Sequence, residues 1–127
     1  MVDRIADMIN TIKTNERIGR PECILLSTKM SRALLDVMKR TSYINGYEEF
    51  NEGRIRMARV ALSNRINNIG VVKPRVAVKA GEIQRYEMRY IPSRDFGILV
   101  LSTSKGLLTN KEAKEQKTGG RLIAYVY

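Results

Sequence analysis

Three hydroxyl side chains, a cation and a glycine stand together near the carboxyl end of the chain: Ser102, Thr103, Ser104, Lys105 and Gly106. Apolar residues flank this segment, with Ile98–Leu101 before it and Leu107 and Leu108 after it. A segment held at both ends has little conformational entropy left to lose when it binds. Hydroxyl groups both donate and accept hydrogen bonds, and glycine allows another backbone to approach closely. Together with the lysine, these residue types favour binding of a polyanion.

The same segment allows three other interpretations. Serine, threonine and glycine are ordinary turn formers. A Walker-type phosphate loop needs glycine, four residues and then Gly-Lys-Ser/Thr, but here the order differs and the first glycine is absent. A hydrolase dyad of Ser102 or Ser104 with Lys105 needs a buried lysine with a depressed pKa, which adjacent residues in a basic loop provide poorly. The sequence therefore predicts that the chain is not an enzyme, and a Ser-Lys hydrolase is the enzymatic alternative.

A similar group of residues, Ser27-Thr28-Lys29, stands at the predicted start of a helix. Free backbone N–H groups at a helix start can hold a phosphate, which makes Ser27 and Lys29 candidate binding residues. An ordinary N-cap also explains a hydroxyl there, and a solvated helix face also explains the lysine. Further candidate cations follow the hydroxyl segment: Lys111, Lys114, Lys117 and Arg121.

The charge of the whole chain supports a polyanionic partner. The 127 residues include 23 Lys and Arg against 13 Asp and Glu, a net charge of +10. Histidine is absent, which excludes His-based metal sites and Ser-His or Cys-His catalysis, and no cofactor is predicted. Cys23 is the only cysteine and is expected to be buried. Neither a signal-peptide core nor a membrane-spanning run is found, so we expect a cytoplasmic protein with no membrane partner.

The residue pattern predicts an α+β fold of two lobes, an N-terminal α/β lobe over residues 1–66 and a C-terminal β-rich lobe over 67–127. The N-terminal order is α-β-α-β-β: helices over 2–16 and 29–40, and strands over 23–26, 43–50 and 53–62. Apolar residues at helical spacing predict the buried stripe of the second helix: Met30, Ala33, Leu34, Val37 and Met38. In the last strand Arg54 and Arg56 alternate with apolar residues, and the alternation slips near Arg59–Val60, which predicts a bulge or a strand end.

The C-terminal lobe is predicted to be mostly antiparallel β-sheet with short helices. Residues 63–72 are the expected linker, 74–79, 98–101 and 121–127 are expected strands, and 81–90 is an expected helix with Ile83, Tyr86 and Tyr90 facing inward. A capping box from Thr109 to Glu112 starts a further helix, which runs to about Lys117. In this interpretation Ser102–Gly106 is a loop between a buried strand and that helix, and two glycines at 119 and 120 end the helix.

These residues also carry a family resemblance. The segment LSTSKGLLTNKEAKEQKTGGRLIAYVY resembles the C-terminal signature of the eighth protein of the small ribosomal subunit, which is Ser-Thr-Ser-x-Gly, a short helix, Gly-Gly and a terminal strand. The segments DRIADMINTIKTNER, STKMSRALLDVMKRTSYI and NRINNIGVVKPR fit the same family, so the resemblance covers essentially the full length. KPRVAVK and PSRDFGILVLSTS resemble the archaeal and eukaryotic branch.

The resemblance implies a structural ribosomal protein with a two-domain α+β fold. Its expected partner is a stem with an irregular internal loop in the central domain of small-subunit ribosomal RNA, bound early in subunit assembly. Residue by residue, the resemblance implies that Ser102, Thr103 and Ser104 bond bases and sugar-phosphate, that Gly106 allows close approach, and that Ser27 and Lys29 form a second contact. It also implies neighbouring ribosomal proteins as partners. The free protein is expected to be monomeric, and a basic architectural nucleic-acid-binding protein outside the ribosome is the alternative.

Overall fold

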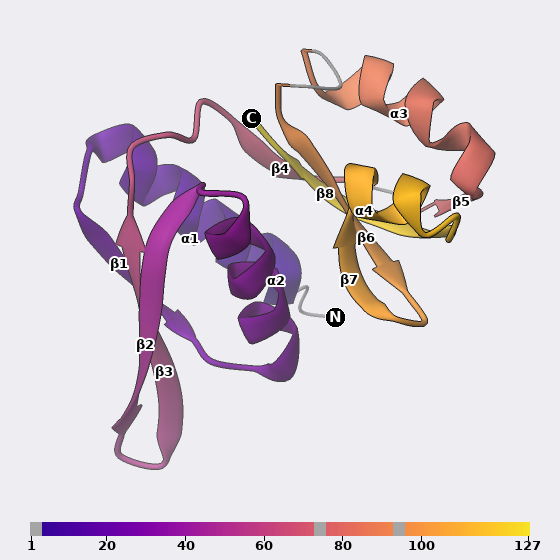
Figure 1. Ribbon diagram of the computed structural model, residues 1–127. Coiled ribbons are helices and arrows are strands. Elements are labelled where there is room, and N and C mark those ends of the chain that lie inside the picture. The colour runs from indigo at the N-terminus through magenta and orange to yellow at the C-terminus, as the bar shows by residue number, and fades with distance from the viewer. Residues whose placement is uncertain (1–3, 73–75, 93–95) are drawn as a thin grey trace. The chain divides into compact units, whose positions relative to one another are not determined.

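The computed structural model describes residues 4–72, 76–92 and 96–127 (Figure 1). The chain divides into two compact units, Met1–Asn67 and Asn68–Tyr127. Each unit combines helices with an antiparallel sheet, which confirms the predicted α+β fold class.

The first unit has the predicted order α-β-α-β-β. Its elements are α1 (Arg4–Ile18), β1 (Glu22–Leu26), α2 (Lys29–Arg40), β2 (Ile44–Glu52) and β3 (Ile55–Leu62). The strands form an antiparallel sheet in the order β1-β3-β2. Residues 2 and 3 of the predicted first helix lie outside the described residues.

Thr28 is the N-cap of α2, one of the two hydroxyl residues expected there, and it forms a capping box with Ser31. The Thr28 hydroxyl accepts a hydrogen bond from the Ser31 N–H (3.1 Å), and the Ser31 hydroxyl accepts one from the Thr28 N–H (2.7 Å). The prediction that Met30 is buried was wrong, because its side chain is 37% exposed. The buried stripe instead begins at Ser31, whose hydroxyl also donates to the Leu26 carbonyl (3.0 Å), and it includes Leu35.

The prediction of a bulge or a strand end near Arg59–Val60 was also wrong, because β3 continues to Leu62. β2 and β3 pair regularly through Arg59–Val60, and the register shifts instead within Ile44–Gly46 on β2. Arg56 lies on the same sheet face as the fully buried Ala58, because alternate strand residues share a face. The inner face of β3 thus changes from the exposed Arg56 to the buried Ala58 while the strand pairing continues unchanged. This change of residue type produces the apparent slip in the alternation.

The second unit is a five-stranded antiparallel sheet with short helices, as predicted. Its strands are β4 (Ile69–Val71), β5 (Ala77–Val78), β6 (Ile98–Thr103), β7 (Gly106–Thr109) and β8 (Gly120–Val126). Its helices are the 3₁₀ turn η1 (Ala80–Glu82), α3 (Ile83–Tyr90) and α4 (Asn110–Glu115). β4-β8-β6-β7 are neighbours in that order, and β5 also pairs with β8. β4 lies within the predicted linker, β7 was not predicted, and residues 74 and 75 of a predicted strand lie outside the described residues.

Two consecutive glycines have a different role from the one predicted. α4 ends at Glu115, and Gly120 is already the first residue of β8. A Cβ atom on Gly120 would lie 2.6 Å from the Ser102 carbonyl oxygen, and one on Gly119 would lie 2.6 Å from the Val78 carbonyl oxygen. The prediction that these glycines end the helix was therefore wrong: they allow β8 to approach its neighbouring strands.

Candidate nucleic-acid interface

The hydroxyl segment forms a tight turn between two strands, so the prediction of a loop leading directly into a helix was wrong. β6 ends at Thr103, β7 begins at Gly106, and these two residues pair directly. Ser104 and Lys105 are thus the two residues of the turn. Gly106 has a φ of +105°, a conformation that glycine adopts without steric cost. β7 then returns along β6 before Thr109 caps α4 through the predicted capping box with Glu112.

The Thr103 hydroxyl holds the turn closed. It donates a hydrogen bond to the Gly106 carbonyl (2.8 Å) and accepts one from the Lys105 N–H (3.1 Å). Ser104, Lys105 and Gly106 are exposed, and within the described residues the Ser104 hydroxyl has no hydrogen-bond partner. The turn therefore uses one hydroxyl for its own geometry and leaves the next one open to a ligand.

Strand pairing brings a cation beside the turn. Ser102 lies opposite Arg121 of β8 on one side and opposite Leu107 of β7 on the other. Directly opposed residues of antiparallel strands have neighbouring side chains on one sheet face. The exposed Arg121 and the half-buried Ser102 are therefore neighbours. We call the group formed by Ser102–Gly106 and Arg121 the hairpin surface.

The two candidate lysines of α4 have different surroundings. Lys111 is exposed in the first turn. Lys114 is only 34% exposed, and its ammonium group forms an ion pair with the carboxylate of Glu87, which is 2% exposed. The charge of Lys114 therefore compensates a buried carboxylate of the protein itself.

Asn110 completes the surroundings of Glu87. Its Nδ2 group donates a hydrogen bond to Glu87 Oε2, and its Oδ1 atom accepts one from the Leu99 N–H (3.2 Å). This buried cluster joins α3, α4 and β6. Sequence reasoning missed it because a glutamate in a short helix is usually exposed, although Glu87 follows the inward-facing Ile83 by four residues, which places both on one helix face.

Ser27 and Lys29 flank the N-cap of α2 in the first unit. Lys29 is exposed. The Ser27 N–H donates to the Arg56 carbonyl (2.9 Å), while the Ser27 hydroxyl oxygen is buried and has no hydrogen-bond partner among the described residues. The Arg56 side chain, which the sequence left without a role, forms an ion pair with Glu49. Lys29 is therefore accessible to a partner, whereas the Ser27 hydroxyl is not.

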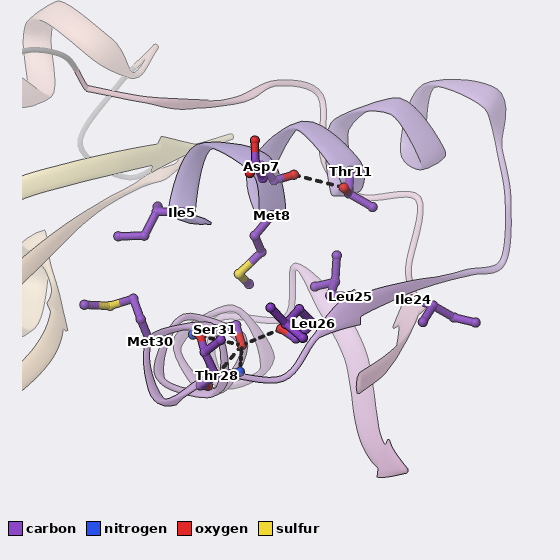
Figure 2. Close-up of a pocket in the computed structure, with 10 residues that line it drawn as sticks. All are labelled: Ile5, Asp7, Met8, Thr11, Ile24, Leu25, Leu26, Thr28, Met30 and Ser31. Atoms are coloured by element: carbon purple, nitrogen blue, oxygen red, sulfur yellow. Dashed lines mark hydrogen bonds between the residues drawn. The ribbon is translucent and has the colours of Figure 1, made fainter. Parts of the chain in front are cut away.

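A pocket of about 190 Å³ lies beside the start of α2 (Figure 2). Most of its lining side chains are apolar, and the figure shows the hydroxyls of Thr28 and Ser31 bonded within the capping box. Asp7 is the only carboxylate among the residues that line it, and these include no lysine, arginine or cysteine. This composition provides no acid–base pair for catalysis.

At the hairpin surface, Lys105 is exposed and so lacks the burial that a Ser-Lys dyad requires.

Two observations concern other kinds of site. Within residues 4–72, 76–92 and 96–127, no group of three or more metal-binding side chains is found. No helix in the described part of the chain is long and apolar enough to cross a membrane.

Cys23 is buried as expected, and burial, reinforced by the charges of Glu16 and Glu22, raises the pKa of its thiol to about 11.

Comparison with known proteins supports the resemblance found in the sequence. The family model described as ribosomal protein S8 matches residues 3–127. A protein of Picrophilus torridus is 47% identical over 126 residues, and proteins of Thermoplasma volcanium and Thermoplasma acidophilum are 44% and 43% identical over the same length. Each alignment covers 98% of this chain and 98% of the relative, and each relative is named small ribosomal subunit protein uS8. The matches confirm the predicted family and, with it, a ribosomal and non-enzymatic role. The chain belongs to the ribosomal protein S8 family.

Proposed function

We propose that this chain is a primary binding protein for a stem with an irregular internal loop in the central domain of small-subunit ribosomal RNA. Family membership supports the coarser role of a structural constituent of the small subunit. The hairpin surface supports a mode of binding in which serine hydroxyls contact bases and sugars while neighbouring cations contact phosphates. In this proposal the protein holds one folded RNA element early and presents it for further assembly.

One observation carries the proposal: the turn is closed by its own threonine and presents an unpartnered serine hydroxyl next to a lysine. The two internal hydrogen bonds of Thr103 fix the positions of Ser104 and Lys105. Little ordering entropy is then lost on binding. A serine hydroxyl adapts to base edges and to ribose hydroxyls because it both donates and accepts.

The chemistry of RNA favours such a surface. Side chains cannot reach the base edges in the deep, narrow major groove of an A-form helix, so specific recognition uses distorted loops and the shallow minor groove. Short hydroxyl side chains fit a shallow groove. Lys105 and Arg121 supply phosphate contacts, which give affinity, while Ser104 gives discrimination.

A second contact is proposed at the start of α2. The exposed Lys29 stands next to the helix N-terminus, where backbone N–H groups and the helix dipole favour a phosphate. Lys111 extends the proposed phosphate contacts along the second unit. Lys114 is assigned mainly to Glu87 and contributes to the RNA contact indirectly, by holding α4 in place.

A filter-binding titration against fragments of small-subunit ribosomal RNA tests the proposal. We expect one fragment, which contains a stem with an irregular internal loop, to bind much more tightly than the others. Replacing that internal loop by regular base pairs should abolish the preference, because the distorted shape is what the turn recognises. Equal affinity for every fragment, or displacement of the RNA by excess duplex DNA, would contradict the proposal.

A further inference from the structure

The sheet of the first unit has one face that carries exposed apolar side chains. The register of β1, β3 and β2 places alternate residues on this outer face, opposite the face of the buried Cys23 and Leu25. The large apolar residues of the outer face are Ile24, Leu26, Phe50, Ile55 and Met57. Leu26 pairs with Met57, and Met57 pairs with Phe50, so these three form a row across all three strands.

Three of these large apolar side chains are exposed, whereas Phe50 and Met57 of the row are half-buried. Ile24, Leu26 and Ile55 are 48%, 44% and 54% exposed. Single exposed apolar residues are common on protein surfaces, whereas a contiguous group on one sheet face indicates an interaction site.

The charges of the outer face are opposite in sign to those of the whole chain. The strand positions of the face carry Glu22, Glu48 and Glu52 but only one cation, Arg59, in a protein of net charge +10. Lys39 of α2 borders the face, because it lines a pocket together with Glu22 and Glu48. The Arg59 guanidinium lies 5.3 Å from the centre of the Phe50 ring, and its Nε atom is 3.9 Å from Glu22 Oε1. No ion pair joins Glu48 or Glu52 to another of the described residues. The face is therefore apolar with an acidic border.

The apolar side chains and the acidic border together indicate which kind of partner could bind this face. Nucleic acid and anionic lipid are disfavoured, because carboxylates repel phosphates and the face offers one engaged arginine to bind them. A second copy of the chain packed through the same face would bring glutamates against glutamates. A polypeptide segment that carries apolar side chains between lysines or arginines complements both the row and its border.

We propose that the outer face of the β1-β3-β2 sheet docks a basic, apolar segment of another protein, and that it makes no contact with RNA. The apolar row buries the partner's side chains, and Glu48 and Glu52 bind its cations. This inference goes beyond the proposed RNA contact, which uses other residues.

A thiol introduced on the face tests the inference in the assembled particle. The native Cys23 is buried and reacts slowly, so the variant I55C carries one reactive thiol at an exposed position of the face. We expect a maleimide to label I55C about tenfold more slowly in small subunits than in the free protein, because docking excludes the reagent. A photo-crosslinker attached to that thiol should join a protein segment rich in lysine or arginine. I24C provides a second reporter on the same face.

Several outcomes would overturn the inference. The first is labelling of both thiols in the subunit at the same rate as in the free protein. The others are crosslinks to the wrong partner, which are RNA, an acidic protein segment or a second copy of this chain. Filter binding of the same variants to ribosomal RNA is measured in parallel, so that a failure of docking is distinguished from a failure of the RNA contact.

Charge reversal tests the acidic border separately. In the I55C background, Glu48→Lys combined with Glu52→Lys should speed labelling in the subunit by about tenfold, because the partner's cations are then repelled. Glu115→Lys reverses one charge at an exposed position of α4 and should leave the labelling rate unchanged. Equal labelling rates with and without the double reversal would show that the border does not select the partner.

Discussion

Neighbouring side chains of the β6–β7 turn have separate roles: one holds the backbone and the others remain open to a ligand. The Thr103 hydroxyl donates to the Gly106 carbonyl across the turn and accepts from the Lys105 N–H, whereas the Ser104 hydroxyl has no partner among the described residues. The sequence shows three hydroxyls in a row without indicating this division, because it depends on where the strand pairing ends.

Replacing Ser104 by alanine should weaken RNA binding without weakening the fold. We expect a loss of about 1 kcal/mol in binding free energy, the usual value of one polar contact, and an unchanged melting temperature. Filter binding and thermal unfolding measure the two quantities. Thr14→Ala, which removes an exposed hydroxyl on α1, is the matched control and should not change RNA affinity. A lower melting temperature with intact affinity would show that the Ser104 hydroxyl is structural.

The thiol of Cys23 should be inert in the folded protein. Because burial raises its pKa from the ordinary 9.0 to about 11, the reactive thiolate is nearly absent at pH 8. A chromogenic disulfide reagent should react at pH 8 only after denaturation. Between pH 9 and 11 the unfolded thiol ionises while the folded thiol keeps its proton, so the contribution of this group to stability is lost as the pH rises through that range. Rapid reaction of the native protein at pH 8 would contradict this prediction.

Among the elements, β8 depends on the absence of a side chain at its first residue. A Cβ atom at position 120 would lie 2.6 Å from the Ser102 carbonyl oxygen and 2.7 Å from Thr103 Cγ2. Gly120→Ala should therefore push β8 away from β6 and reduce the free energy of unfolding by roughly 1–3 kcal/mol, the usual range for overpacking. Urea unfolding measures the change.

Gly81→Ala is the control for this substitution. Gly81 has no positive φ, and apart from its chain neighbours no atom of the described residues lies within 4 Å of where its Cβ would stand. Alanine should be neutral or slightly stabilising there, because it reduces the conformational freedom of the unfolded chain. If both glycine variants unfolded at the same urea concentration as the parent protein, the close approach of β8 would not matter for stability.

The ion pair between α3 and α4 gives a second prediction at this scale. Among the described residues, Lys114→Ala leaves the Glu87 carboxylate, 2% exposed, with only its bond to Asn110. We expect unfolding to cost about 2 kcal/mol less, somewhat below the usual figure for a broken buried pair because Lys114 is one-third exposed. Lys105→Ala removes an exposed lysine and should leave stability unchanged. Equal stability of the two variants would show that Glu87 does not need Lys114.

Helix and strand patterns predicted most of the elements, and the errors have physical reasons. Thr109 was predicted as an N-cap, and the cap of α2 was narrowed to Ser27 or Thr28, because capping depends on residues close in sequence. β7 was missed because four residues after a two-residue turn carry too little periodicity to be recognised. The spacing of Glu87 from Ile83 placed it on the buried helix face, but its partners Lys114 and Asn110 come from another helix, so local patterns did not predict the ion pair.

For the molecule as a whole, charge and hydroxyl chemistry act together in binding. The net charge of +10 indicates affinity for polyanions, but it does not distinguish cations that face a partner from those that compensate internal carboxylates. The sequence treats Lys105 and Lys114 alike, while the structure pairs only Lys114 with a buried acid. The candidate list from the sequence therefore contains residues with different roles.

The salt dependence of RNA binding should separate these roles. Lys105→Ala should reduce the slope of log affinity against log salt concentration by about one, because one phosphate contact is lost. Lys114→Ala should leave the slope nearly unchanged at temperatures where the variant is folded. The measurement is filter binding at several salt concentrations. An unchanged slope for Lys105→Ala would remove that phosphate contact from the proposal.

The buried Glu87–Asn110 pair limits how this protein can change through evolution. The amide of Asn110 donates to Glu87 through its nitrogen and accepts from the Leu99 N–H through its oxygen. Aspartate has the same shape but no N–H donor, so it would set two carboxylates against each other away from water. Relatives that carry an acidic residue at the position of Asn110 must therefore have lost the acid at the position of Glu87, and the two positions should vary together across the family.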